Sequence, residues 1–180
     1  MTEAKALTVR ADGRANAIST PVGVCLPFAH NDQKMAGVSS DQFMAIWDTG
    51  ATNSAITPQV VAAAGLKPSG QIVVNTAGGD VTTNTYLVHL LLPMGLVIPN
   101  LTVTEAPLAG ADALIGMDII GLGDFSITHK EGKTVMSFRI PSMVEHDFVP
   151  EADRYNAKMI RREVQATVGQ RSQPRKHRKG

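Results

Sequence analysis

The sequence has little cysteine, few aromatic residues and no long apolar run. The single cysteine, Cys25, excludes an internal disulfide and a cysteine-based zinc site, and it suits a reducing compartment. Aromatic residues make up only 4% of the chain, so the core must be built mainly from aliphatic side chains. No window approaches the roughly 18 apolar residues of a membrane span, and no signal-peptide pattern follows Met1. These absences predict a globular protein of the cytoplasm with no membrane partner.

The charge is unevenly distributed along the chain, although the net charge is only +1. Residues 151–180 carry nine Lys or Arg and three acidic residues, whereas the rest of the chain carries eight Lys or Arg and thirteen acidic residues. This asymmetry predicts an acidic body with a basic appendage. We therefore expect an N-terminal arm at 1–16, a domain at 17–141, and a C-terminal extension at 142–180 that is helical at first and then basic and disordered.

The basic tail admits two interpretations. It could bind nucleic acid or another acidic surface, but it lacks the interleaved aromatic residues that many nucleic-acid sites use. A solvated end is therefore the favoured interpretation, and no nucleic-acid partner is expected. Salt-dependent binding of nucleic acid that disappears on deletion of Gln170–Gly180 would favour the nucleic-acid interpretation.

Short apolar and β-branched runs, separated by Gly and Pro, predict a domain built mostly of strands. The expected strands are Ala6–Arg10, one or two within Ala17–Phe28, Gln42–Trp47, Gln71–Asn75, Val81–Leu92, Leu96–Thr104, Ala113–Ile115, Phe125–His129 and Thr134–Ile140.

The connections between these strands carry recognisable signals. Ala77–Asp80 is expected to form a hairpin tip, because its glycines supply the positive φ of a tight turn. Thr57-Pro58 is expected to open a short helix with the Thr57 side chain as its cap, and Met117–Ile120 to form one helical turn. A longer helix is compatible with Asp153–Thr167, and His30–Asp41 is expected to be a loop.

The residues that point to chemistry are Asp48-Thr49-Gly50. They follow an apolar strand directly, so the carboxylate would leave the core at the edge of a sheet, partly desolvated as acid–base work requires. Gly50 and Ala51 are small and let another backbone come close. Thr52 and Asn53 add polar groups without bulk. A tripeptide recurs by chance, so an ordinary turn at the end of a strand is the alternative.

Three segments in this order resemble the retropepsin-like aspartic protease family: Ile46–Ala51, the glycine-tipped hairpin Asn75–Thr83, and Leu114-Ile115-Gly116 leading into Met117–Ile120. The resemblance covers roughly Ile18 to Ile140. It implies an all-β fold, namely a closed and mostly antiparallel β barrel with one short helix, to which the basic tail is appended.

The resemblance also implies roles for individual residues. Asp48, Thr49 and Gly50 would form the catalytic loop, with the Thr49 hydroxyl bonding across a two-fold axis. Substrate backbone would contact Ala51, Thr52 and Asn53 from below and Gly78 and Gly79 from the flap. Leu114, Ile115 and Gly116 would support the loop from beneath.

A protease of this type needs two carboxylates that share one proton, and this chain has only one such triplet. The resemblance therefore implies a homodimer in which Asp48 of each copy supplies half of the site. The implied activity is that of an acid protease, an aspartic endopeptidase that hydrolyses polypeptides with an activated water. It needs no cofactor and no metal. The alternative is a catalytically inactive module that dimerises and binds an extended peptide by strand addition.

Some positions differ from the viral members of the family. Thr52 and Asn53 are neutral where those enzymes carry acidic residues, and Met117 stands where they carry an arginine. The ion pair that steadies viral dimers is therefore missing, and the pattern is closer to that of single-domain bacterial and cellular members. Trp47 is bulky where an aliphatic residue is common, and we expect it to pack in the core.

Other reactive side chains have simpler interpretations. The five histidines show no metal-ligand spacing, and His89 is expected to be an ordinary paired strand residue. Asp112 and Asp118 flank Leu114-Ile115-Gly116, and they are expected to cap the short helix Met117–Ile120 rather than to act in catalysis. Cys25 is expected to be a buried, inert thiol.

Overall fold

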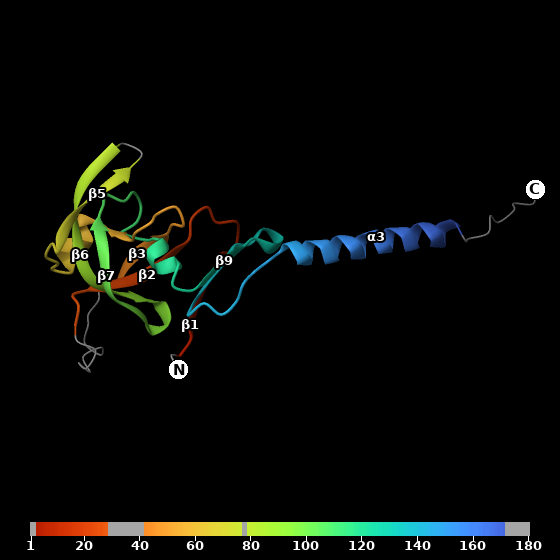
Figure 1. The fold of residues 1–180 in the computed structure, drawn as a ribbon, viewed down its shortest axis with the longest axis horizontal. Helices are drawn as coiled ribbons and strands as arrows, with labels where there is room; N and C mark the ends of the chain where they lie inside the picture. The colour runs from red at the N-terminus through yellow and green to blue at the C-terminus, as the bar shows by residue number, and fades with distance from the viewer. Residues whose placement is uncertain (1–2, 29–41, 77–78, 172–180) are drawn as a thin grey trace, which may run out of the picture. The chain divides into compact units, whose positions relative to one another are not determined.

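The computed structural model describes residues 3–28, 42–76 and 79–171, and the chain forms two compact units, Met1–Met143 and Val144–Gly180 (Figure 1). The predicted loop at His30–Asp41 lies outside the described residues. Gly78 and the tail beyond Arg171 also lie outside them.

The described part of the first unit contains ten strands and two short α-helices. The strands are β1 (Lys5–Arg10), β2 (Ser19–Cys25), β3 (Gln42–Trp47), β4 (Ala55–Ile56), β5 (Gly70–Thr76), β6 (Gly79–Leu92), β7 (Leu96–Glu105), β8 (Ala113–Ile115), β9 (Asp124–Thr128) and β10 (Val135–Ile140). The helices are α1 (Pro58–Ala63) and α2 (Met117–Ile120), and 3-10 turns occupy η2 (Pro93–Gly95) and η3 (Lys130–Gly132).

Six strands close into a barrel. They pair in the order β2-β3-β8-β4-β7-β6, and β6 pairs back onto β2 through Gly23↔Leu91 and Val24↔Leu90. β5 continues the sheet outside this ring and forms a hairpin with β6 that projects from the barrel (Figure 1). The predicted closed barrel is confirmed, although two of its pairs, β3–β8 and β4–β7, are parallel.

A second, three-stranded sheet has the order β1-β10-β9 and places its aromatic residues against the barrel. The Trp47 ring lies 5.7 Å from that of Phe125, stacked on it, and 5.0 Å from that of Phe138. The Trp47 indole N–H donates to Thr20 Oγ1 at 3.0 Å. Trp47 is only 7% exposed, so its predicted place in the core is confirmed.

His89 is fully buried and holds two distant backbone segments together. Its Nδ1 accepts from the Asn100 N–H at 3.0 Å, which places the ring proton on Nε2, 3.1 Å from the carbonyl oxygen of Phe28. Asn100, within β7, has a φ of 53°, and a register shift between Val88 and Leu90 leaves His89 out of the β6–β7 ladder. It pairs instead with Cys25, as a strand residue of β6.

Replacing this histidine should destabilise the barrel. In His89→Leu the Asn100 N–H and the Phe28 carbonyl lose their side-chain partner, so we expect the free energy of unfolding to fall by about 1–3 kcal/mol. Urea denaturation followed by Trp47 fluorescence measures it. Leu87→Ala, which changes a 40% exposed side chain of the same strand, is the control and should stay within about 0.5 kcal/mol. Equal stability of the two variants would contradict the bridging role.

Asp124 organises the chain after β10. Its carboxylate accepts from Ser142 Oγ at 2.6 Å, from the Met143 N–H at 2.9 Å and from the Arg139 guanidinium. The hydrogen bond from Ser142, followed by those from Arg139 and Met143, holds the pKa of Asp124 well below its usual range. Because the folded-state pKa is depressed, the stability it contributes is complete above the ordinary pKa near 3.8 and is lost as the pH falls below it.

The second unit contains the helix α3 (Val149–Arg171), which begins and ends four residues beyond the predicted Asp153–Thr167 at either side. Its described side chains are all exposed. Arg154, Lys158, Arg161 and Arg162 have the spacing of one helical face. Within the described ranges, no helix combines the length and the apolar character needed to cross a bilayer.

Candidate active site

Asp48 lies at the carboxyl end of β3, where the parallel strand β8 also ends. Trp47 pairs with Ile115 in this parallel register, and the Asp48 N–H continues it by donating to the Ile115 oxygen at 2.9 Å. The Trp47 N–H donates to the Ile18 oxygen on the other side of β3. Ile115, one of the three residues predicted to support the loop, thus makes a direct backbone bond to Asp48, whose side chain is half-buried.

The triplet forms a turn that fixes one carboxylate oxygen of Asp48. The Gly50 N–H donates to Oδ1 at 2.8 Å, the arrangement of an Asx turn. A Cβ at Gly50 would lie 3.2 Å from that oxygen, a tight contact that glycine avoids. Oδ2 has no hydrogen-bond partner among the described residues. Thr49 is exposed.

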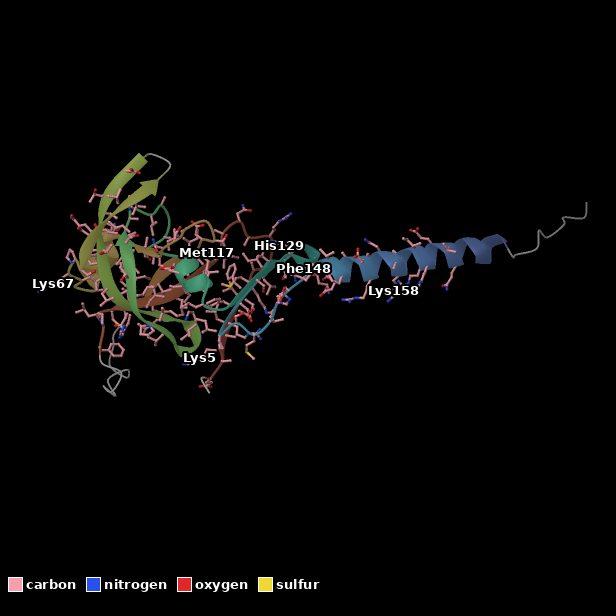
Figure 2. The ribbon with its side chains drawn as sticks, viewed as in Figure 1. Lys5, Lys67, Met117, His129, Phe148 and Lys158 are labelled. Carbon is pink, nitrogen blue, oxygen red and sulfur yellow. The ribbon has the colours of Figure 1, made fainter. Side chains whose placement is uncertain are left out.

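The loop after the triplet is held by the start of α2. The Met117 N–H donates to the Ala51 oxygen at 2.8 Å, and the Asp118 N–H donates to the Thr52 oxygen at 3.2 Å. Gly116 permits this approach, because a Cβ there would lie 2.7 Å from the carbonyl carbon of Asn53. Figure 2 shows Met117 on this helix. Its side chain is 43% exposed.

A buried network between Ser54 and Asp118 reinforces these backbone bonds. Asp118 accepts from the Ser54 N–H at 2.9 Å and from Ser54 Oγ at 2.7 Å, and Ser54 Oγ accepts from the Gly116 N–H at 3.0 Å. Asp118 also accepts from the Ile119 N–H at 2.9 Å. Sequence reasoning assigned Asp118 only to a helix cap and missed Ser54, because no local pattern links residues 64 positions apart.

The predicted caps around these helices are wrong in two places. Asp112 does not cap α2; its Oδ2 accepts from the Met44 N–H at 2.8 Å, because Asp112 precedes β8 and lies beside β3. Thr57 is the N-terminal boundary residue of α1, but its buried hydroxyl makes no capping bond and no other bond within the described residues. Cys25 is half-buried rather than buried, and desolvation raises the pKa of its thiol.

Gly116→Ala should disrupt the loop directly. The new methyl group would approach the carbonyl groups of Asn53 and Ala51 to within 3.0 Å, so the loop or α2 must shift. We expect a loss of about 1–3 kcal/mol of unfolding free energy, measured by urea denaturation. Gly13→Ala is the matched control, since a Cβ there meets nothing within 4 Å. Equal stability of the two variants would contradict the close packing described here.

A cleft of about 470 Å³ lies between the loop and the β5–β6 hairpin. The loop contributes Gly50, Ala51, Thr52 and Asn53, and the other lining residues are Ala55, Ile72, Val73, Val74, Thr104, Ala106, Leu108 and Leu114. No lining residue is charged. Three of the predicted substrate-contact residues thus share one cleft, and Leu114 lines it as well.

Of the two glycines predicted to contact substrate from the flap, Gly79 is described and Gly78 lies outside the described residues. Gly79 belongs to β6, where it pairs with Thr76 and has a φ of 108° that glycine tolerates, and it is not among the residues that line the described cleft.

The base of the hairpin is fixed by Glu105, which sequence reasoning did not single out. Its carboxylate accepts from the Tyr86 hydroxyl at 2.5 Å, and its backbone oxygen accepts from Thr83 Oγ1 at 2.6 Å. Burial, and then the Glu105 carboxylate, raises the pKa of Tyr86. Thr83 lies beyond the last β6–β7 pair, Thr85↔Thr104, so these bonds hold β6 where it leaves the barrel.

No group of three or more potential metal ligands occurs among the residues that the structure describes. Comparison with protein families matches residues 35–121 to the model described as "gag-polyprotein putative aspartyl protease". That segment contains the Asp48 loop, the β5–β6 hairpin, β8 and α2. A search of curated proteins finds no match.

Solved structures with similar backbones include a retropepsin-like aspartic protease from Rickettsia conorii, at 11% identity and a TM-score of 0.46, over 77% of this chain and 97% of that one. The EIAV protease complexed with the inhibitor HBY-793 matches at 18% identity and a TM-score of 0.45, over 59% of this chain and 86% of that one. The retroviral protease-like domain of Ddi1 from Leishmania major matches at 16% identity and a TM-score of 0.42, over 74% of this chain and 99% of that one.

These TM-scores are below 0.5, so the assignment depends on the family match and on the topology of the barrel. The matched segment begins before β3 and ends at Gly121, directly after α2, and it includes every strand of the closed ring except β2. The match over residues 35–121 and the closed barrel support a relationship of this chain to the retropepsin-like aspartic protease family.

Proposed function

We propose that the protein is an aspartic endopeptidase whose active site consists of two Asp48 carboxylates, one from each copy of a homodimer. The observation that carries the proposal is the position of the Asp48-Thr49-Gly50 turn, which opens the loop lining the uncharged cleft beneath the β5–β6 hairpin. One chain supplies one such carboxylate, so the second must come from another copy.

The proposed chemistry is direct attack of water on the scissile carbonyl. Two carboxylates about 3 Å apart cannot both be ionised, so they share one proton. The ionised member takes a proton from the water while the other donates its proton to the carbonyl oxygen. The Gly50 N–H already engages Oδ1, which leaves Oδ2 to face water and substrate. Thr49 is exposed beside it and would bond across the two-fold axis.

The cleft favours extended peptides with uncharged side chains near the scissile bond. Its walls are mostly apolar, with Ile72 and Val74 from β5 and Leu114 from β8, and polar groups come from Thr52, Asn53 and Thr104. A charged side chain placed there would lose its hydration without gaining an ion pair.

Hydrolysis of a peptide library in ¹⁸O-water between pH 4 and 7 tests this proposal. Direct attack places one heavy oxygen in each new C-terminal carboxylate, and added hydroxylamine captures nothing because no acyl-enzyme forms. Mass spectrometry identifies both the cleaved bonds and the label. Formation of hydroxamate products would overturn the mechanism, and the absence of any cleavage would overturn the enzyme assignment.

A non-catalytic role has one observation in its favour. β5 is the last strand of its sheet, with no strand paired to its outer edge in the described part of the chain. Such an edge can accept an extended peptide as an added strand. Peptide binding without cleavage, equal in the native chain and in Asp48→Asn, would support this alternative.

A further inference from the structure

The β5–β6 hairpin supplies one wall of the cleft, but the barrel ladder holds only its base. Ile72, Val73 and Val74 of β5 line the cleft, and within the described ranges β5 pairs with no strand other than β6. The last β6–β7 pair is Thr85↔Thr104, so among the described strands the part of β6 before Thr85 pairs only with β5. The position of this wall therefore depends on what holds β6 just before Thr85.

Glu105 lies at that point, one residue after Thr104, and is bonded to side chains from both faces of β6. Successive side chains of a strand point to opposite faces. On one face, the Glu105 carboxylate accepts from the Tyr86 hydroxyl at 2.5 Å and from the Asn84 amide at 3.4 Å. On the other face, the Thr83 hydroxyl donates to the Glu105 backbone oxygen at 2.6 Å. Because both faces are held at once, β6 cannot rotate about its own axis without breaking one of these bonds.

The same group of side chains reaches the second strand of the hairpin. Gln71 of β5 pairs with Asn84, and its amide donates to Asn84 Oδ1 at 3.2 Å. Gln71 directly precedes Ile72, so the bonds that start at Glu105 end beside the wall of the cleft. We call this set of residues the hairpin brace: Gln71, Thr83, Asn84, Tyr86 and Glu105.

The backbone of Glu105 is fixed to the strand that follows the catalytic loop. Glu105 pairs with Ile56 of β4, and the Ala106 N–H donates to the Ile56 oxygen at 3.0 Å. Thr104 and Ala106, on either side of Glu105 in the chain, both line the cleft. The strand period therefore points the Glu105 side chain to the opposite face. Glu105 is placed to act on the cleft through the hairpin rather than by touching a peptide.

Burial and charge show that the carboxylate depends on these donors. Tyr86 is only 3% exposed and Glu105 is half-buried. Neither of the ion pairs found among the described residues includes Glu105, so its charge is stabilised by hydroxyl and amide donors. Burial raises the pKa of Tyr86, which keeps its hydroxyl a donor over the pH range of the proposed activity.

We propose that Glu105 is a positioning residue which, through the hairpin brace, holds the β5 wall over the cleft and thereby sets the affinity for peptide. This inference rests on the proposed function, because it concerns the same cleft. A hairpin that swings away loses its contacts with the bound peptide equally in the ground state and in the transition state. Such a loss raises KM and leaves kcat nearly unchanged.

Steady-state kinetics of Tyr86→Phe test the effect on binding, with the best-cleaved peptide of the library as substrate. The change removes one hydroxyl and leaves the buried ring in place. We expect KM to rise about two- to tenfold, the effect of one lost hydrogen bond, and kcat to stay within about twofold. Tyr155→Phe is the matched control, since Tyr155 is the other tyrosine of the chain and is 64% exposed on α3. An unchanged KM, or a loss confined to kcat, would overturn the positioning role.

Backbone hydrogen exchange of the full chain tests the brace itself and does not depend on activity. In Tyr86→Phe, the amides of β5 are expected to exchange several-fold faster than in the native chain, because the hairpin opens locally. The amides of the β1–β10 pair, which makes no contact with the brace, should exchange at the native rate. Equal acceleration in both regions would indicate a general loss of stability and would overturn the proposal, as would unchanged exchange in β5.

Two substitutions of Glu105 separate the hydrogen bonds from the charge. Glu105→Gln retains a side-chain oxygen that can accept from Tyr86, so its KM and its β5 exchange should stay close to those of the native chain. Glu105→Ala removes the acceptor and should show at least the effects of Tyr86→Phe. If Glu105→Gln is as harmful as Glu105→Ala, the hydrogen-bonded brace is not what positions the hairpin.

The proposed function and the positioning role fail differently. A chain that cleaves peptides with the same KM before and after Tyr86→Phe retains the proposed function and loses the role of Glu105. A chain that cleaves no peptide loses the proposed function, and the positioning of substrate is lost with it, whatever the exchange of β5 shows about the hairpin.

Discussion

Asp48→Asn is expected to lower kcat/KM for peptide hydrolysis on the order of 10³-fold or more, because the amide can neither accept the proton of the water nor donate one to the carbonyl. The fold should be unchanged. Asn retains an Oδ1 that can accept the Gly50 N–H, and Asp48 makes no other side-chain hydrogen bond among the described residues. Cleavage is followed by mass spectrometry, and thermal unfolding is measured on the same preparation.

Mixing the variant with the native chain tests the shared site more sharply. If each dimer needs two Asp48 carboxylates, an equal amount of Asp48→Asn leaves roughly half of the native chains in fully native dimers, and activity falls to roughly half. Independent sites would leave activity unchanged. Unchanged activity after full exchange of subunits, or cleavage by the variant alone, would refute the dyad.

Asp118→Ala is expected to impair both stability and activity. The substitution leaves the Ser54 N–H and hydroxyl without their acceptor in a buried site. Each buried donor left unpaired costs about 1–3 kcal/mol. The loop that carries Ala51 and Thr52 would lose its support on α2, and a shift near 1 Å is enough to lower catalysis on the order of 10²-fold.

Urea denaturation and steady-state kinetics measure the two effects. Asp118→Asn, which keeps one carbonyl oxygen, should recover part of each, and Ser54→Ala combined with Asp118→Ala should be less harmful than the sum of the single changes. Because Asp118 acts through the loop, the loss should fall on kcat more than on KM. Glu131→Ala, at an exposed carboxylate, is the control. Additive single effects would show that Ser54 and Asp118 do not form one network.

The features that the sequence predicted are those encoded by neighbouring residues. The strand leading into Asp48 and the β5–β6 hairpin follow from local patterns of apolar residues and glycine. Trp47 could be placed in the core because a large apolar side chain at the end of a buried strand has few other places to go.

The features that the sequence did not predict depend on residues far apart in the chain. The Ser54–Asp118 network and the bridge from His89 to Phe28 join positions that no helical or strand period connects. The Thr57 cap failed for the same reason: the Thr57 N–H already donates to the Asp112 oxygen, so tertiary contacts rather than capping fix this residue. Propensity indicated the short helices, but not what their ends would contact.

The parallel pairing of β3 with β8 also determines when the Asp48 loop can fold during synthesis of the chain. Asp48 is bonded to Ile115, and Ser54 to Asp118, so the loop cannot be assembled until the ribosome has released residues up to α2. Contacts of such long sequence separation form late and slowly, because the chain between them must be closed first. A nascent chain that ends within the hairpin therefore carries the Asp48 turn without its support, and the proposed proteolytic chemistry arises only when the barrel is nearly complete.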